Sequence, residues 1–281
     1  MNQDATGRAA APVISLLTDF GTRDAFVGIC KGVILRIAPG AQLIDLTHEV
    51  RPYRIRDGAV WLRAALPYLP IGVHLAIVDP GVGTERRAIA LKAARGDLLV
   101  GPDNGILVPG AEALGGIVAA HELANPAYRL ETVSGTFHGR DVFAPAAAHL
   151  ATGVPIEALG PAIPLANLVS LEIPRPRLEP GRLVAVALRT DRYGSVETAA
   201  TLADLEAALG PLAFGDRLRL VTRGSGPAQP LPWAKTFGSV PAGEPLLYVN
   251  SYGLVSVALN MASAADRFGI SDDDELAIER A

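Results

Sequence analysis

Three short apolar runs, each followed directly by polar residues, constrain what this chain can fold into. The runs are residues 13–17, 42–46 and 73–78, and they lead into Thr18-Asp19, Thr47-His48 and Asp79. Residues 25–37 and 56–69, which lie between the runs, have the apolar spacing of helices. Alternating strands and helices predict an α/β domain with a mostly parallel sheet. Ligands of such sheets bind outside the carboxyl ends of the strands, so these three ends are the candidate sites for chemistry.

The segment 173–181 marks the best domain boundary. It holds Pro174, Pro176 and Pro180, and proline lacks the backbone donor that a helix or a central strand needs. After it come β-type runs at residues 182–188, 217–222, 245–249 and 255–259, and only residues 202–209 have a helical pattern. We therefore expect an α/β N-terminal domain over 12–172, a linker over 173–181, and a smaller, mainly β, barrel-like domain over 182–281.

Composition excludes several classes of protein. Hydrophobic residues make up 49% and charged residues 19% of the 281 residues, enough apolar material for an ordered core. The net charge is −4 and the basic residues are scattered, which argues against nucleic acid as a partner. Cys30 is the single cysteine, so no intrachain disulfide can form, which fits a reducing compartment. Neither a signal peptide in residues 1–11 nor a long apolar span is evident, so we expect a cytoplasmic protein without a membrane partner.

The densest cluster of chemistry-bearing residues is 79–87, Asp-Pro-Gly-Val-Gly-Thr-Glu-Arg-Arg. Here an apolar strand delivers a carboxylate to a glycine-rich turn, where backbone can approach a ligand closely. It is no dinucleotide fingerprint, because the third glycine position holds Arg86, and no Gly-Lys-Ser/Thr of a phosphate loop follows. An ordinary strand exit with two solvated arginines remains the alternative interpretation.

Two further glycine-rich segments carry polar residues. Residues 101–105 contain Asn104-Gly105, which most simply forms a tight turn. Residues 135–141 place His138 between glycines, ahead of a helix expected over 142–151. The acids Asp19, Asp24, Asp79 and Asp103 also permit a hard-metal site. No HxH, HExxH or DxD pattern accompanies them, so metal-dependent hydrolysis is a minority interpretation.

Five motifs together resemble one enzyme family. They are Leu-Thr-Asp-Phe-Gly-Thr at 17–22, Asp-Pro-Gly-Val-Gly-Thr at 79–84, Pro-Asp-Asn-Gly at 102–105, Thr-Phe-His-Gly-Arg-Asp at 136–141 and Asn-Ser-Tyr-Gly at 250–253. They resemble, in order and over residues 12–278, the S-adenosyl-L-methionine (SAM) hydroxide adenosyltransferases, relatives of the fluorinase and chlorinase. The resemblance implies a homotrimer whose active sites lie between one subunit's N-terminal domain and a neighbour's C-terminal domain. It also implies attack of water on C5′ of SAM, giving adenosine and methionine without a metal or other cofactor.

The resemblance also implies site residues. Asp79, Arg86 and His138 match the set that positions the attacking water, a set that the halogenases lack, and Asp19 matches the acid that binds the ribose. Other residues expected to bind the substrate are Tyr193, Ser195, Phe237, Ser251, Tyr252, Ser256, Leu259 and Met261. Two of these depart from the family pattern: Ser195 stands where an Asn reads the adenine edge, and Ser256 where hydrolytic relatives have Glu. A hydroxyl offers a single donor where an amide both donates and accepts, so base choice can differ.

The expected function is therefore hydrolysis of SAM at C5′. One alternative within the family is a nucleophilic halogenase or an enzyme for a different adenosyl sulfonium. An alternative of another class is a nucleoside- or SAM-binding protein without turnover.

Overall fold

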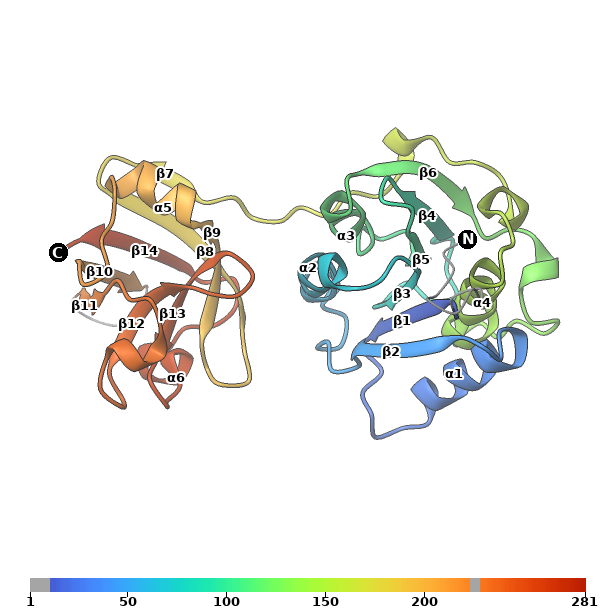
Figure 1. The fold of residues 1–281 in the computed structure, drawn as a ribbon, viewed down its shortest axis with the longest axis horizontal. Helices are drawn as coiled ribbons and strands as arrows, with labels where there is room; N and C mark the ends of the chain where they lie inside the picture. Colours follow the sequence, from blue (N-terminus) through green and yellow to red (C-terminus); the bar gives the residue numbers. More distant parts are fainter. Residues whose placement is uncertain (1–10, 223–227) are drawn as a thin grey trace, which may run out of the picture. The chain divides into compact units, whose positions relative to one another are not determined.

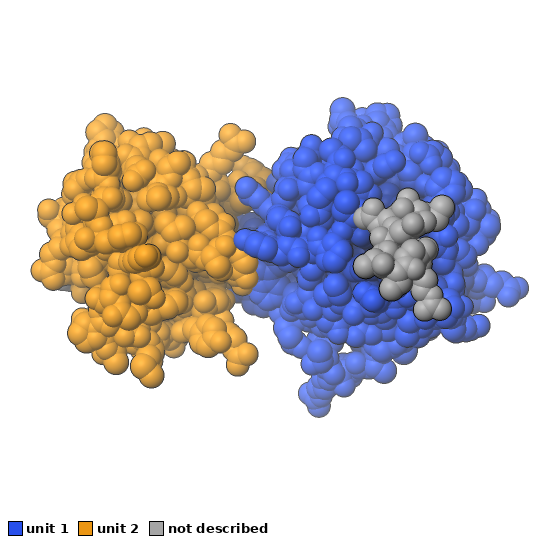
Figure 2. All heavy atoms as spheres, in the orientation of Figure 1, with its two compact units in different colours: residues 1–171 blue, residues 172–281 orange. Residues whose placement is uncertain are grey.

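A computed structural model describes residues 11–222 and 228–281 (Figure 1). The chain divides into two compact units, the first ending at Leu171 and the second beginning at Glu172 (Figure 2). Residues 1–10, on which the expectation about a signal peptide largely rests, lie outside the described part. Among the described residues, no helix combines the length and the apolar character needed to cross a bilayer.

The first unit is built on a six-stranded sheet in the order β2-β1-β3-β5-β4-β6 (Figure 1). Strands β2, β1, β3 and β5 run parallel, whereas β4 pairs antiparallel with both β5 and β6. The expected mostly parallel sheet is thus confirmed. Its elements are β1 (Val13–Thr18), α1 (Phe26–Ile37), β2 (Gln42–Thr47), α2 (Ile55–Ala65), β3 (Val73–Ile77), β4 (Ala88–Ala93), β5 (Leu98–Pro102), α3 (Val108–Ala113), β6 (Ile117–Glu122) and α4 (Ala144–Ala151).

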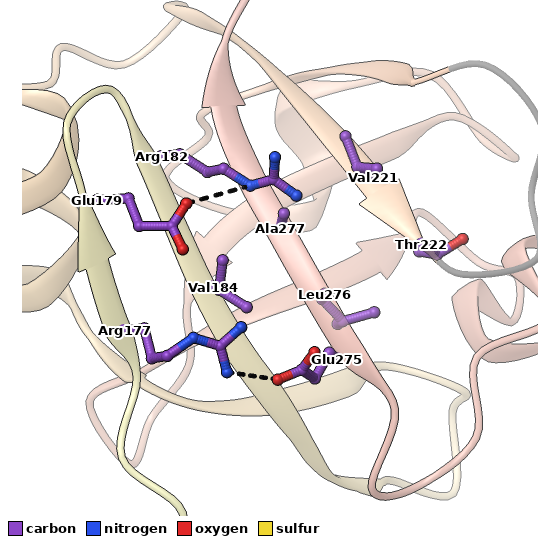
Figure 3. A pocket seen from close by; sticks show the side chains of 9 residues that line it. All are labelled: Arg177, Glu179, Arg182, Val184, Val221, Thr222, Glu275, Leu276 and Ala277. Atoms are coloured by element: carbon purple, nitrogen blue, oxygen red, sulfur yellow. Dashed lines mark hydrogen bonds and ion pairs between the residues drawn. The ribbon is translucent and has the colours of Figure 1, made fainter.

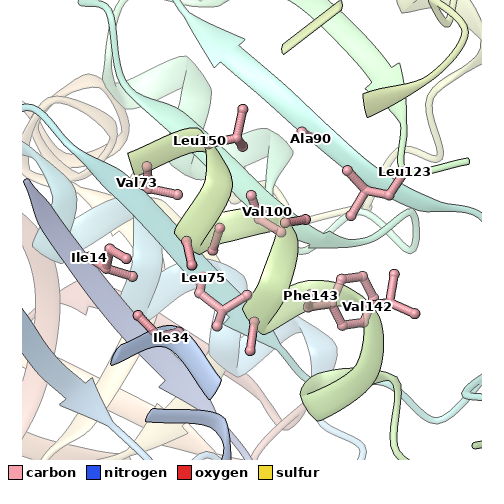
Figure 4. Packing of buried hydrophobic residues seen from close by; sticks show 14 of the residues in the cluster. Ile14, Ile34, Val73, Leu75, Ala90, Val100, Leu123, Val142, Phe143 and Leu150 are labelled. Atoms are coloured by element: carbon pink, nitrogen blue, oxygen red, sulfur yellow. The ribbon is translucent and has the colours of Figure 1, made fainter. Parts of the chain in front are cut away.

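Helices cover both faces of this sheet. Helices α1 and α4 pack together over one face, where Ile34 and Phe143 join a buried cluster with strand residues such as Leu75 (Figure 4). Helices α2 and α3 pack together over the other face, where Leu62 and Ala111 belong to a second cluster. The sheet is therefore buried on both sides, which is why its strands are apolar runs without alternation.

The helix expected over 142–151 is preceded by a different turn. Residues Gly139–Phe143 form one π-helical turn, and α4 follows directly. Pro145 lies in the first turn of α4 and has no N–H that could bond back to the preceding π-turn. π-turns occur frequently at functional sites, and this one directly follows His138.

The second unit is an antiparallel sheet in the order β11-β10-β14-β8-β9-β13-β12, with β7 paired to β8 (Figure 1). This confirms the expected mainly β, barrel-like unit, with its core around Leu183, Leu220 and Val257. Within the segment expected as a linker, three residues form the edge strand β7, a position that tolerates the neighbouring prolines. The elements are β7 (Arg177–Glu179), β8 (Arg182–Thr190), β9 (Val196–Thr201), α5 (Leu202–Leu209), β10 (Arg217–Thr222), β11 (Gln229–Pro232), β12 (Pro245–Val249), β13 (Leu254–Leu259), α6 (Ala264–Phe268) and β14 (Glu275–Arg280).

Candidate active site

The carboxyl ends of β1 and β3 bring Asp19 and Asp79 to one edge of the first sheet. The two strands pair in parallel, with Thr18 opposite Ile77. The helix after β1 covers one face of the sheet and the helix before β3 covers the other, so the winding of the sheet reverses between these strands. A ligand crevice forms at such a switch point. The acids that the strand pattern singled out therefore lie where this fold class places its chemistry.

Asp79, Arg86 and His138 form one hydrogen-bonded cluster. The Arg86 guanidinium donates from Nε to Oδ1 of Asp79 at 3.1 Å and from Nη2 to Oδ2 at 2.5 Å. The same Nη2 lies 3.2 Å from Nδ1 of His138. The side chains of Arg86 and Asp79 are only 9% and 5% exposed. The ring of the buried Phe143 lies 5.2 Å from the guanidinium carbon, a cation–π distance.

The partners of Arg86 settle which nitrogen of His138 carries a proton. A guanidinium has donors only, so Nδ1 of His138 must accept, and the proton of the neutral ring sits on Nε2. Burial and then the charge of Arg86 lower the pKa of His138, which favours this neutral form. Burial raises the pKa of Asp79 in spite of the opposing charge of Arg86. The cluster thus presents a carboxylate of increased basicity beside an imidazole N–H donor.

The glycine-rich loop after Asp79 and the glycine-rich loop before His138 approach each other closely at Gly83 and Gly135. Gly83 has φ of +76°, and a Cβ built there would lie 2.1 Å from the carbonyl oxygen of Gly135. Glycine is therefore required for the loop after Asp79 to approach the loop before His138. This contact explains how residues 52 positions apart in the sequence join one cluster.

Asp19 is held by a residue that the sequence analysis missed. Its Oδ2 accepts the backbone N–H of Tyr53 at 3.1 Å. Tyr53 has φ of +67°, an uncommon conformation for a bulky residue, and the residue is 74% exposed. Burial raises the pKa of Asp19, and the charge of Asp79 contributes in the same direction. No sequence signal marks Tyr53, because left-handed backbone is expected at Gly or Asn instead.

The motif at residues 101–105 has a structural role. Arg87 donates from Nε to Asp103 at 2.9 Å, and Asp103 also accepts the N–H of Val169 at 3.0 Å. The amide of Asn104 donates to the Val78 carbonyl at 2.8 Å, and Gly105 has positive φ. The expected tight turn is present, and it supports the strand that delivers Asp79.

Among residues 11–222 and 228–281, no three His, Cys, Asp or Glu side chains group as a metal site.

In the second unit, three expected substrate residues lie around Tyr248, an aromatic residue that the sequence analysis did not single out. The side chain of Ser195 lies beside the Tyr248 hydroxyl, and the centroid of the Phe237 ring lies 4.9 Å from that of the Tyr248 ring. Ser256 is the register partner of Tyr248 on the neighbouring strand. Ser195, Ser256 and Tyr248 are buried, whereas Phe237 is 41% exposed. The small Ser195 side chain thus lies inside the second unit, beside Tyr248.

Tyr252 lies over a buried ion pair that also escaped the sequence analysis. Arg189 donates from Nε and Nη2 to the two carboxylate oxygens of Glu197, at 2.8 Å and 2.6 Å. The guanidinium carbon lies 5.8 Å from the centre of the Tyr252 ring. Burial raises the pKa of Glu197, although Arg189 opposes this shift.

The remaining expected substrate residues divide between surface and core. Ser251, Tyr193 and Met261 are exposed, and Met261 has φ of +59°. Leu259 is buried in the main core of the second unit, so its side chain is turned away from solvent.

The second unit also has a hollow of about 350 Å³ on the outer side of strands β7, β8, β10 and β14 (Figure 3). Its lining includes the ion pair Arg177–Glu275, with 2.5 Å between Nη1 and Oε1, and the more distant pair Arg182–Glu179. None of the expected site residues lines it. The hollow is thus separate from the candidate chemistry.

Comparison with known proteins identifies the family. The model of the SAM hydroxide adenosyltransferase N-terminal domain matches residues 14–160, and that of the C-terminal domain matches residues 186–277. The chain belongs to this family. An (R)-S-adenosyl-L-methionine hydrolase of Salinispora arenicola is 47% identical over 96% of this chain and 98% of its own length. A fluorinase of an Actinoplanes species is 30% identical over 90% of this chain and 93% of its own length.

One solved structure is similar over nearly the whole chain. An uncharacterized conserved protein from Thermotoga maritima matches with a TM-score of 0.87 and 36% identity, over 95% of this chain and all of that one. Within the SAM hydroxide adenosyltransferases, the chain is thus more similar to the Salinispora hydrolase than to the Actinoplanes fluorinase.

Proposed function

We propose that this protein hydrolyses SAM at C5′, giving adenosine and L-methionine, and that its substrate is the R epimer at sulfur. The observation that carries the reaction is the buried cluster of Asp79, Arg86 and His138 at the switch point of the sheet. The stereochemistry is supported by the name of the Salinispora relative, an (R)-S-adenosyl-L-methionine hydrolase at 47% identity.

The proposed reaction needs one water, and every atom and charge can be followed. The water oxygen forms a bond to C5′ while the C5′–S bond breaks. The electron pair of the C5′–S bond stays on sulfur, so the sulfonium becomes the neutral thioether of methionine. The sulfonium is already a good leaving group, so alignment and deprotonation of the nucleophile are the enzyme's tasks. The proposal therefore requires no metal or other cofactor.

The division of labour within the cluster follows from its hydrogen bonds. Nε2–H of His138 donates to the water oxygen and orients a lone pair toward C5′. Asp79 accepts the water proton, and its raised pKa makes it a better base. Arg86 remains protonated, because a guanidinium does not act as a base in proteins, and it holds both neighbours in place.

Other residues are proposed to bind the substrate. The carboxylate of Asp19 accepts from the two ribose hydroxyls. Phe237 and Tyr252, both partly exposed, offer ring faces in the second unit. Ser195 is buried and carries a single hydroxyl donor, so we expect recognition of the adenine edge to rely less on this position than on an Asn.

The test is incubation of the purified protein with each sulfonium epimer in ¹⁸O-labelled water, followed by mass spectrometry. Adenosine labelled at the 5′ oxygen, formed faster from the R epimer, is the expected result. Binding without product over hours contradicts hydrolysis and points to a binding protein. A chlorinated nucleoside formed only with chloride indicates a halogenase, and loss of activity with EDTA indicates a metal enzyme.

We also propose a homotrimer in the cytoplasm. The trimer is supported by the resemblance of the motifs to those of the family, which combine site residues from two subunits. The cytoplasmic location is supported by a composition with a single cysteine. Analytical ultracentrifugation tests the trimer directly, because a monomer or dimer at micromolar concentration contradicts it.

A further inference from the structure

A row of four buried polar residues crosses the second sheet. Arg189 on β8 is opposite Glu197 on β9, Glu197 is opposite Ser256 on β13, and Ser256 is opposite Tyr248 on β12. Residues directly opposite each other project from the same face of a sheet. We call these four residues the polar row. Each of them is at most 8% exposed.

The polar row lies on the side of β13 away from the main core. Its neighbours Val255 and Val257 belong to the large apolar cluster of this unit, and side chains along a strand alternate between faces. Tyr248 instead belongs to a small cluster with Ala234, Leu246 and Ala258.

Stability alone does not account for the charged half of this row. Arg189 and Glu197 are joined by two hydrogen bonds, yet removing both charges from water costs free energy comparable to what the pairing returns. Apolar residues of similar volume are often neutral or stabilising in place of such a pair. The groups that the row contacts indicate a different role.

A partly exposed aromatic ring lies at each end of the polar row. The guanidinium of Arg189 is 5.8 Å from the ring of Tyr252, which is 49% exposed. At the other end, the centroid of the Tyr248 ring is 4.9 Å from that of Phe237, and the Tyr248 hydroxyl lies beside Ser195. The two exposed rings are those proposed above to contact the substrate.

We propose that the polar row positions Tyr252 and Phe237, and thereby sets the affinity for the substrate. Glu197 fixes the plane of the Arg189 guanidinium beneath the Tyr252 ring. The buried Tyr248, with its hydroxyl beside Ser195, provides the surface against which Phe237 packs. The four residues act through the two rings, so they are positioning residues and not catalytic ones. This inference rests on the proposed function.

The decisive variant is R189M/E197L, which replaces the buried pair by apolar residues of similar length. We expect a melting temperature close to that of the wild type, since the desolvation cost of the pair is removed. We expect KM to rise roughly tenfold, as when a group supporting a binding side chain is lost, with kcat changed less than about twofold. The matched control is R219M/E279L, which removes a more exposed ion pair of the same unit, together with the contact of Glu279 to Arg182, and should leave KM unchanged. A folded R189M/E197L variant with wild-type KM overturns the proposal.

A second variant and a measurement without substrate complete the test. Y248F removes only the buried Tyr248 hydroxyl at one end of the polar row, so it should fold and raise KM. If R189M/E197L does not fold, an unchanged KM in Y248F overturns the proposal. Hydrogen exchange of residues 250–253 in the ligand-free protein should be faster in R189M/E197L than in the control. Unchanged exchange contradicts the positioning role whatever the hydrolysis assay shows. A wild-type protein that does not hydrolyse SAM contradicts the proposed function instead.

Discussion

The guanidinium of Arg86 has donors only, and it uses them on both Asp79 and His138. If Nε2–H of His138 orients the water, a glutamine at this position should do so in part, because its side-chain amide also has an N–H donor. We expect His138→Gln to retain kcat within about tenfold of the wild type, and His138→Ala to lose about a hundredfold or more. Steady-state kinetics of the two variants decide the matter. Equal losses in both contradict a donor role and indicate that His138 acts as a base.

Asp79 should set the acid limb of the pH–rate profile. Burial raises its pKa, so activity should fall with decreasing pH at a value above the ordinary aspartate range near 4. Asp79→Asn should lower kcat by about 10² to 10⁴ and leave KM nearly unchanged, because the lost interaction is with the attacking water. The residual activity of this variant should also lack the acid limb. A variant that keeps near wild-type kcat contradicts the assignment of the base.

At the scale of loops, the approach of Gly83 to Gly135 should be required for activity. Gly83→Ala places a Cβ against the Gly135 carbonyl, so the loop before His138 must move. Gly153→Ala is the matched control, since Gly153 also has positive φ but has open space around its Cβ position. We expect both variants to lose about 1 kcal/mol or more of stability from backbone strain, but only Gly83→Ala to lose most of its kcat. Similar kcat in the two variants would show that the loop contact is dispensable.

Strands β1 and β3 share a buried network that resembles a catalytic triad but has no access to solvent. His74 lies 2.8 Å from the Ser15 hydroxyl and 2.9 Å from Asp97, which also accepts from Arg95. Ser15, His74 and Asp97 are fully buried, so no substrate reaches them. Their role is to satisfy polar groups inside the sheet.

This network predicts acid sensitivity of the first unit. The hydrogen bonds and charges of Arg95 and His74 outweigh burial and hold the pKa of Asp97 well below its ordinary value. A depressed carboxyl pKa stabilises the fold above the unfolded value near 4, and this contribution is lost as pH falls below it. Urea unfolding between pH 2 and 7 should therefore show a steeper loss of stability below about pH 4 in the wild type than in Asp97→Asn. The same slope in both proteins contradicts this role of Asp97.

Whether a feature was predictable depended on the range of the interactions that define it. The ends of β1 and β3 could be located because an apolar run followed by an acid is a local signal, and Asp19 and Asp79 lie there. The antiparallel strand β4 was not expected, because the sequence of one segment does not specify which strand it pairs with or in which direction. The polar row depends on register across four strands, with irregularities next to Arg189 and Ser256 that no local pattern marks. The left-handed backbone of Tyr53 is likewise set by its surroundings, because it is unfavourable for that residue alone.

For the whole molecule, the proposed trimer makes a prediction about mixtures of inactive chains. The cluster of Asp79 lies in the first unit and the polar row in the second. If each site combines the first unit of one subunit with the second unit of a neighbour, two variants impaired in different units can together form an intact site. We expect chains carrying Asp79→Asn, co-expressed in equal amounts with chains impaired in the second unit, to form wild-type sites at about a quarter of positions.

Tyr252→Ala with Phe237→Ala serves as the second-unit variant, because loss of both rings should abolish measurable binding at low substrate concentration. Activity of the co-expressed mixture is then compared with that of each variant alone. Co-expression of Asp79→Asn with His138→Ala is the matched control, since both changes lie in the first unit and no arrangement of subunits restores an intact cluster. Recovery in the first mixture but not in the second supports sites shared between subunits. No recovery in a mixture shown by mass spectrometry to contain mixed trimers contradicts shared sites, since each chain would then have to supply both units of its own site.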